Sequence, residues 1–521
     1  MLAIRQGEWN MLLRKLAVFT AAMMIAATAG QVRAADTWIK AESAHFVIYS
    51  DAPEKKTRTY VKKLEAFRAL TNLLLGSGDS GPQVKFEIYL LNDGDQMLVV
   101  RPSFSRYVGG VYFNCAEGTS AYGAAQNGGD IMDEQDQSQI TLFHEYSHYV
   151  MFQHARTYYP AWYVEGFAEY LSTADPKNGT ISIGENNQGR SYLLAEDHWI
   201  GFDRVLNPDF GFTGDKSNDP TEIESFYAQS WLLTHFMLSD PARAKALNAY
   251  FAALGRGGDP IKSWEDTTGI KVATLHTTLD RYSSKMFYLN VPVADYPDSD
   301  IQVAPVAAGA SLLDRSLLTT CMPPDQGKAV LARLQADRAA QPGDIDLALA
   351  ATRAELLYGR IEDAETDAGA LIDAHADNFD ANYLMGRVYL KEAGAAKGQD
   401  RSDLMDAARG FFVAAYGINK LDAPNLYFLA QSYADKPGFP DQNTVNAANG
   451  AHVLAPGVGD YAMFAAFTDL ATDKRDDAVS LLTPFVSDPH DRAAAERIQK
   501  AIDAIKAGKP VNDVMALLNA G

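Results

Sequence analysis

The chain has 521 residues, more than a single hydrophobic core organises, so we expect roughly two to four domains. Hydrophobic residues make up 47% of the chain and charged residues 21%, as in ordinary globular proteins. The 66 acidic and 46 basic side chains give a net charge of −20. Because this charge repels phosphate backbones and anionic lipid surfaces, nucleic acid is excluded as the expected partner.

Residues 1–34 have the pattern of a secretory signal peptide. Arg14 and Lys15 precede an uncharged run over 16–32, and the sequence VRA offers a cleavage site after Ala34. The run is close to the lower limit of about 17 residues for a membrane span, so an uncleaved anchor is the alternative. We expect cleavage after Ala34, export to a bacterial periplasm and no stable membrane insertion of the mature chain.

Residues 35–290 mix strand and helix patterns, and we expect an α+β domain there. HFVIYS (45–50), the alternating VKFEIYLL (84–91) and GGVYFN (109–114) each predict a strand. Helical spacing dominates from 136 to 284.

Residues 291–326 are expected to link this domain to the next one. The first part of the stretch, VPVADYPDSDIQVAPVAAGA, is rich in Pro, Asp and small residues and has no helical period. Of the two cysteines, Cys115 lies in the α+β domain and Cys321 in the linker. A single disulfide and two free thiols both remain open.

Residues 327–521 are rich in alanine and predict an all-helical domain with a repeat. The segment 345–357 aligns with 379–391, and Tyr427 with Tyr461, each at an offset of 34 residues. This period resembles tetratricopeptide repeats, whose stacked helix pairs form a concave surface for another protein. An insertion around AAKGQDRSDL interrupts the register, and the first-helix Trp is missing, so a non-repeating helical bundle is the alternative.

HEYSH, inside ITLFHEYSHYVMF, has the spacing of a metal site. On a helix His144 and His148 lie one turn apart on the same face, where both imidazoles can bind one zinc ion. Glu145 is rotated by roughly 100° and can reach an open coordination position as a base.

A third ligand is expected from AWYVEGFAEY, because a zinc site needs one more protein donor. Pro160 predicts a helix start, and Glu165 on that helix can reach the metal. Glu169 lies one turn further on the same face, where it can accept the free ring N–H of a ligand histidine. The alternative is a core helix, but two carboxylates on its aromatic face would need a cation between them.

Together HEYSH and WYVEGFAEY resemble the gluzincin metallopeptidases, and roughly residues 38–285 are similar to peptidase MA-like bacterial proteins. The resemblance implies a zincin-like fold with Zn²⁺ bound by His144, His148 and Glu165, and with Glu145 as the general base. The signature by which aminopeptidase N relatives hold a free amino terminus is missing, so an endopeptidase is expected.

An oxyanion donor is also expected, and the resemblance favours Tyr227 on the helix over 221–238. That helix is expected to begin with a capping box of Thr221 and Glu224. His198 and His235 are alternatives for the donor, and a half-buried structural role for Tyr227 remains open.

The sequence therefore predicts an exported zinc metallopeptidase that hydrolyses peptide bonds, with repeats that recruit a substrate or partner protein. GGVYFN is a candidate edge strand for an extended peptide. One alternative is a catalytically silent zincin-fold scaffold or assembly factor that acts through its repeats. A hydrolase of carbohydrate or lipid is another. The sequence is silent on the substrate, the cleavage specificity and the oligomeric state.

Overall fold

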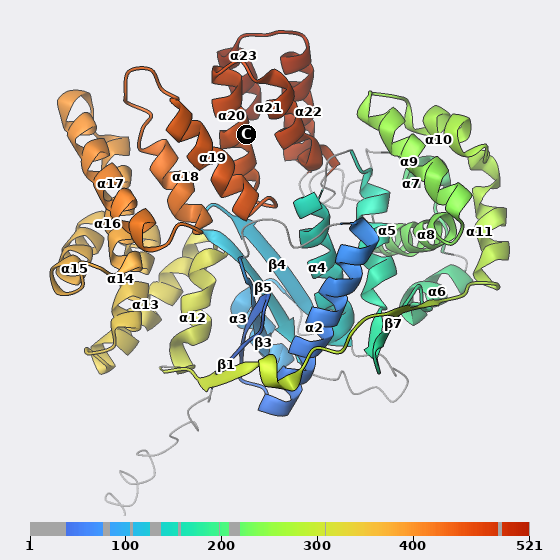
Figure 1. The fold of residues 1–521 in the computed structure, drawn as a ribbon, viewed down its shortest axis with the longest axis horizontal. Helices are drawn as coiled ribbons and strands as arrows, with labels where there is room; N and C mark the ends of the chain where they lie inside the picture. Colours follow the sequence, from blue (N-terminus) through green and yellow to red (C-terminus); the bar gives the residue numbers. More distant parts are fainter. Residues whose placement is uncertain are drawn as a thin grey trace, which may run out of the picture.

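The computed structural model describes residues 38–76, 84–104, 108–125, 137–154, 158–196, 198–207, 219–307, 309–487 and 492–519. The expected signal peptide lies outside these ranges. Within them, no helix is both long and apolar enough to cross a bilayer. The chain forms a mixed α/β region followed by a helical region, and the two lie side by side (Figure 1).

A mixed six-stranded sheet lies in the middle of the molecule, in the order β4–β5–β3–β2–β1–β9 (Figure 1). The β2–β3 and β3–β5 pairs are parallel, and the other pairs are antiparallel. The strands expected from the sequence are β2, β3 and β4, and β4 is an edge strand of this sheet. The bounds are β1 (Ile39–Glu42), β2 (Phe46–Ser50), β3 (Phe86–Leu91), β4 (Gly110–Cys115), β5 (Gly118–Ala124) and β9 (Gln302–Pro305).

Both faces of the sheet are buried, because successive side chains of a strand point to opposite sides. Phe46, Ile48 and Phe86 pack with α2 and α4 on one face. Tyr89 and Tyr122 pack on the other face with the helices that open the C-terminal region, α12 to α14. The sheet therefore shares a core with both halves of the chain.

The α/β region also contains the helices α2 to α11 and a small antiparallel sheet in the order β6–β7–β8. The expected helix over 221–238 is α8, but its cap differs from the expected box of Thr221 and Glu224. Asp219 is the N-cap and accepts from the Thr221 N–H, because Pro220 occupies the first turn and moves the start of the helix. The bounds are α2 (Glu54–Leu75), α3 (Met97–Val100), α4 (Gln137–His154), α5 (Ala161–Ser172), β6 (Asp175–Lys177), β7 (Thr180–Ile183), α6 (Gln188–Ala195), α7 (Phe202–Val205), α8 (Pro220–Leu238), α9 (Pro241–Gly255), α10 (Pro260–Thr268), α11 (Leu275–Ser283) and β8 (Leu289–Pro292).

The segment 291–326, expected as a linker, is built into the fold. Its strand β9 pairs along the whole of β1, and its helix α12 packs under the sheet. Cys321, at its end, is bonded to Cys115 at the end of β4, which resolves the open question about the two cysteines. Proline and small residues there mark an edge strand and turns rather than a free tether.

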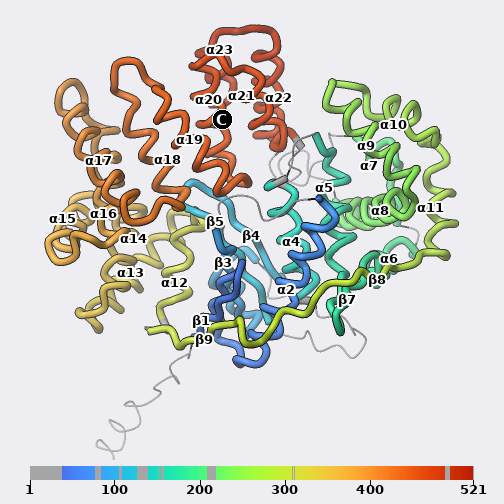
Figure 2. The backbone as a smooth tube through the Cα atoms, viewed as in Figure 1, coloured from blue at the N-terminus to red at the C-terminus, as the bar shows by residue number. Residues whose placement is uncertain are grey.

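The C-terminal region is a series of helix pairs that arches from beside the sheet over the end of β4 and β5 (Figure 2). The aligned segments begin α14 and α16, and Tyr427 and Tyr461 lie on α18 and α20. The insertion lengthens α16 and α17 instead of forming a long loop. The bounds are α12 (Leu312–Ser316), α13 (Pro324–Ala340), α14 (Ile345–Tyr358), α15 (Ile361–Ala374), α16 (Phe379–Ala395), α17 (Gly398–Ile418), α18 (Ala423–Gln431), α19 (Gln442–Leu454), α20 (Gly459–Ala471), α21 (Arg475–Leu482), α22 (Arg492–Lys506) and α23 (Val511–Leu518).

The helices α5 and α8 approach most closely at Gly166. A β-carbon there would overlap the side chain of Thr234 and lie 2.7 Å from the carbonyl carbon of Ser230. Since the second group is backbone, a side-chain rotation cannot make room for it. The glycine is therefore required by the contact between the two helices.

We expect Gly166→Ala to destabilise the protein. Overpacking costs about 1–3 kcal/mol, which exceeds the roughly 1 kcal/mol that alanine gains over glycine in a helix. The free energy of unfolding, measured by denaturant titration, should fall. Gly410→Ala is the control, since Gly410 lies in α17 with no atom near its missing β-carbon, and it should be neutral or stabilising. Equal stabilisation by both variants would contradict this account of the contact.

Candidate metal centre

The helix α4 presents its two histidines on the side opposite its apolar face. Phe143 stacks on Phe67 of α2 with ring centroids 4.0 Å apart, and Tyr146 packs on Phe46 of β2. These contacts fix the rotation of the helix, because residues three and four apart share a face. His144 and His148 therefore point away from the sheet.

The helix α5 carries both carboxylates expected from the sequence. Pro160 is its N-cap residue, as the sequence predicts. Glu165 is 0% exposed and Glu169 is 4% exposed. The aromatic side of the same helix is held in the core, where Trp162 meets Trp264 edge to face. Because α5 packs against α8 at Gly166, the side of α5 that carries the two carboxylates faces α4.

Three donor atoms converge between the two helices. The Nε2 atoms of His144 and His148 lie 3.0 Å apart, and Oε2 of Glu165 lies 3.5 Å from each of them. In a tetrahedral site with bonds of about 2.0–2.1 Å, ligand atoms are about 3.3–3.4 Å apart. The donor set therefore has the spacing and the chemistry to hold one divalent cation such as zinc.

Burial of Glu165 favours a positive charge at the same point. A carboxylate removed from water costs several kcal/mol unless charge or hydrogen bonds offset the loss. Burial also lowers the pKa of His144, but the carboxylates of Glu165 and Glu169 outweigh this and raise it above its usual value. The surroundings thus attract a cation to the imidazole pair.

Glu169 lies behind His144 and is held in place by a network of polar contacts. Its Oε1 is 3.5 Å from Nδ1 of His144, the ring nitrogen that faces away from the other two donors. Arg190 makes a two-pronged contact with the carboxylate at 2.8 and 3.2 Å, and Asn187 donates to it at 3.1 Å. Arg190 also bonds Glu224. Glu169 is thus placed to orient the imidazole, the role expected from its position in the sequence.

Arg190 and Asn187 were not among the residues singled out in the sequence, and Glu224 was expected only as a capping-box residue. Arg190 lies on α6, and Asn187 caps that helix by accepting from the Arg190 N–H. No motif in NNQGRSYLL signals this role, because the contact joins elements far apart in the chain. The guanidinium of Arg190 also lies over the Tyr227 ring, 5.0 Å from its centroid.

A cleft of about 480 Å³ opens at His144, and Glu145, Tyr227 and Arg190 also line it. The Tyr227 ring centroid is 6.4 Å from that of His144. Burial, with the charges of Glu165 and Glu169, raises the pKa of Tyr227 well above its usual value, so the phenol keeps its proton near neutral pH. It can therefore donate a hydrogen bond into the cleft.

The two alternatives to Tyr227 lie elsewhere among the described residues. His235 is buried in α8, with its ring nitrogens bonded to the Gly184 carbonyl and the Tyr282 hydroxyl. His198 is an exposed residue after α6. Neither of them is among the residues that line the cleft.

We expect Glu169→Ala to weaken zinc binding about 10–100-fold, because His144 then loses the carboxylate that lies 3.5 Å from its Nδ1. Competition with a zinc-binding dye measures the dissociation constant. Glu224→Ala is the matched control, since Glu224 also bonds Arg190, whereas His144 lies within ion-pair distance of Glu165 and Glu169. If both variants bind zinc as tightly as the wild type, Glu169 does not orient the ligand.

Comparison with known proteins adds little to this geometry. No protein-family model matches the sequence, and no curated protein matches it. A crystal structure of a thermophilic TPR protein from Thermus thermophilus covers 38% of this chain and 99% of its own, at 14% identity and a TM-score of 0.32. A similarity at this level establishes neither fold nor function.

Proposed function

We propose that this protein is an exported zinc-dependent endopeptidase of the gluzincin type. The observation that carries the proposal is the approach of His144, His148 and Glu165 to within 3.5 Å of one another, beside a cleft that Glu145 lines. Two imidazoles, one carboxylate and a nearby second carboxylate are the groups that metal-assisted hydrolysis needs.

Each residue of the site has a distinct role in the proposed reaction. His144, His148 and Glu165 would hold the zinc ion. When bound there, zinc would supply a Lewis acid able to polarise a carbonyl group and to lower the pKa of water to about 7. Glu145 takes the proton from the attacking water and returns it to the leaving amine. Tyr227 donates a hydrogen bond to the oxygen on which negative charge develops.

The edge strand β4 supports a peptide as the substrate. The Ala124 N–H donates to the Gly109 carbonyl, so these two residues form a hydrogen-bonded pair of the β4–β5 ladder. Along an antiparallel ladder such pairs alternate with pairs that are not hydrogen-bonded to each other. The peptide groups of Gly110, Tyr112 and Asn114 therefore face away from β5. An extended peptide can pair with these groups through its main chain, largely independently of its sequence.

Export and the helical repeats belong to the same proposal. The disulfide between Cys115 and Cys321 supports an oxidising compartment such as a periplasm, where such bonds persist. Helix pairs that recur after 34 residues support tetratricopeptide-like repeats.

We expect Glu145→Gln to retain zinc and to lose peptide hydrolysis by about 10²–10⁴-fold, because the amide cannot take a proton. Cleavage of a broad peptide library by full-length protein, with metal content from mass spectrometry, tests this. Wild-type protein that binds zinc but cleaves no peptide would instead favour the silent scaffold. Hydrolysis of glycosides or esters alone would favour the other hydrolases.

We expect Tyr227→Phe to lower kcat by about 100–1,000-fold, the usual effect of removing an oxyanion donor. KM and zinc content should change little, since the aromatic ring remains in place. Steady-state kinetics on a cleaved library peptide measures the effect. Tyr192→Phe, at an exposed tyrosine of α6, is the control and should retain full activity. An unchanged kcat in Tyr227→Phe would return Tyr227 to a structural role.

A further inference from the structure

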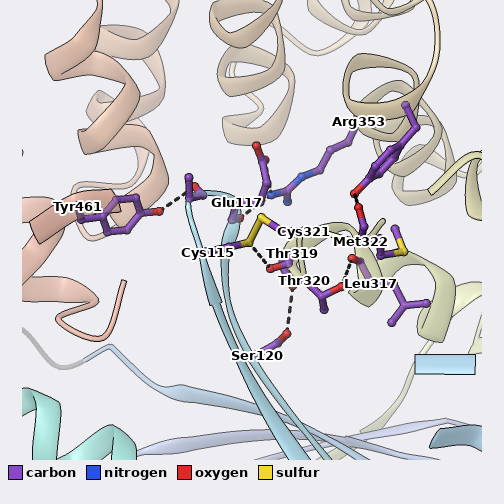
Figure 3. Close-up of a disulfide and its surroundings, with 12 residues drawn as sticks. Cys115, Glu117, Ser120, Leu317, Thr319, Thr320, Cys321, Met322, Arg353 and Tyr461 are labelled. Carbon is purple, nitrogen blue, oxygen red and sulfur yellow. Dashed lines mark hydrogen bonds and ion pairs between the residues drawn. A yellow bond between two sulfur atoms is a disulfide. The ribbon is translucent and has the colours of Figure 1, made fainter. Parts of the chain in front are cut away.

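The turn between β4 and β5 lies against the helical repeats. It consists of Ala116 and Glu117, and Figure 3 shows Glu117 beside Arg353 and the disulfide. The side chain of Ala116 packs with buried residues of two repeat clusters, which include Leu426 of α18 and Tyr383 of α16. The tip of an N-terminal hairpin is thus enclosed by C-terminal helices.

Glu117 forms an ion cluster with two arginines from successive helix pairs. Arg387 of α16 binds both of its carboxylate oxygens at 2.7 and 2.9 Å. Arg353 of α14 donates to its carbonyl oxygen at 2.7 Å and lies 3.3 Å from its carboxylate. Burial would raise the pKa of Glu117, but the two guanidinium groups lower it below its usual value. The carboxylate therefore stays charged inside the repeats.

Further contacts hold the residues on either side of Glu117. The Tyr461 hydroxyl of α20 donates to the Ala116 carbonyl at 2.9 Å (Figure 3). A β-carbon at Gly457, just before α20, would lie 3.2 Å from the side chain of Asn114. Cys115 is bonded to Cys321. The end of β4 is therefore bonded to parts of the chain that follow it by more than 200 residues.

The local sequence explains this turn only in part. The central pair is Ala116-Glu117, and neither residue has a positive φ, whereas Gly118 directly after the pair has a φ of 144°. A glycine with positive φ that follows the central pair is a common feature of hairpins. The contacts with the repeats add to this local preference.

The other end of β4 contacts the helix of the metal centre. A β-carbon at Gly110 would lie 3.1 Å from the side chain of Thr141, which lines the cleft. The ring of Tyr112 meets that of Tyr149 on α4 edge to face, with centroids 6.0 Å apart. A displacement of β4 would therefore disturb α4 on the side of the cleft that Thr141 lines.

Little space remains in the groove around the hairpin tip. The free volume there is about 270 Å³, below the range of about 300–1,000 Å³ that is typical of sites for small molecules. The hairpin thus occupies part of the groove that the repeats form.

We propose that the repeats grip the β4–β5 hairpin through Glu117 and thereby hold β4, the edge strand beside the metal centre, in the position that pairs with substrate. Glu117 is a positioning residue that acts through β4. The partner of the concave face is thus a segment of this chain. The catalytic consequence rests on the proposed function, whereas the grip itself does not.

The test compares Glu117→Gln with Asp435→Asn in the full-length protein. Both carboxylates have 11% exposed side chains and pair with a buried arginine, Arg387 or Arg409, but only Glu117 belongs to the hairpin. Hydrogen exchange measures the amides of Val111 and Phe113, which face β5. Zinc content and steady-state kinetics on a cleaved peptide complete the measurement.

We expect Glu117→Gln to speed exchange in β4 at least about tenfold, since local opening becomes easier. KM should rise about tenfold with kcat and zinc content retained, the signature of lost ground-state binding. Asp435→Asn should leave both readouts near wild type. The double variant Cys115→Ser/Cys321→Ser, which loosens the same strand by another route, should shift them in the same direction as Glu117→Gln.

Unchanged exchange in β4 of Glu117→Gln, or equal acceleration in Asp435→Asn, would overturn the inference. So would faster exchange combined with an unchanged KM. If the wild type cleaves no peptide, the proposed function fails, and exchange in β4 still decides whether the repeats hold the hairpin.

Discussion

The structure around the candidate metal centre depends on one constraint, the burial of the Glu165 carboxylate between two imidazoles. A helix that carries such a group cannot be placed by hydrophobic packing alone, because the charge has to meet a compensating partner. Gly166 lets α5 approach α8 closely, and the aromatic residues on the rest of α5 fill the core. The carboxylate is thereby held at the distance from α4 that a shared cation requires.

Charge around the centre is arranged in alternating layers. Glu165 lies next to the histidines, Glu169 behind His144, and Arg190 behind Glu169. Each group offsets part of the charge of its neighbour. The three donor atoms are therefore held in place without leaving any one buried charge isolated. Arg190 also lies over the Tyr227 ring. The residue that holds Glu169 behind His144 therefore also contacts a side chain that lines the cleft.

The two halves of the chain form a single structural unit. The sheet packs on α12 to α14 through a shared core, β9 returns to pair with β1, and the disulfide closes the same junction. Repeat proteins usually present a concave face to another protein. Here that face encloses the β4–β5 turn, so the proposed recruiting surface is engaged within the chain. A scaffold that acts through this groove would first have to release the hairpin.

The sequence by itself determined what depends on short separations along the chain. Period-two alternation placed β2, β3 and β4, helical spacing placed α4 and α5, and the offset of 34 residues placed the starts of α14 and α16. His144 with His148 and Glu165 with Glu169 were singled out because helix geometry puts residues four apart on one face. Glu145 was singled out from its place directly after His144 in the motif. The start of α8 was misplaced because Asp219 and Pro220 provide a stronger helix start than Thr221 and Glu224.

Only the tertiary structure decided how distant segments meet. Arg190 reaches Glu169 from 21 residues away, Arg387 reaches Glu117 from 270 residues away, and Cys115 is bonded to Cys321 across 206 residues. The stretch expected as a linker became β9 and α12 because the edge of β1 and the open face of the sheet needed partners. Such pairings follow from the packing of the whole chain. One chain offers many compatible partners for an arginine, a cysteine or a strand edge. The periodicity of the sequence carries no information about which of these partners meet.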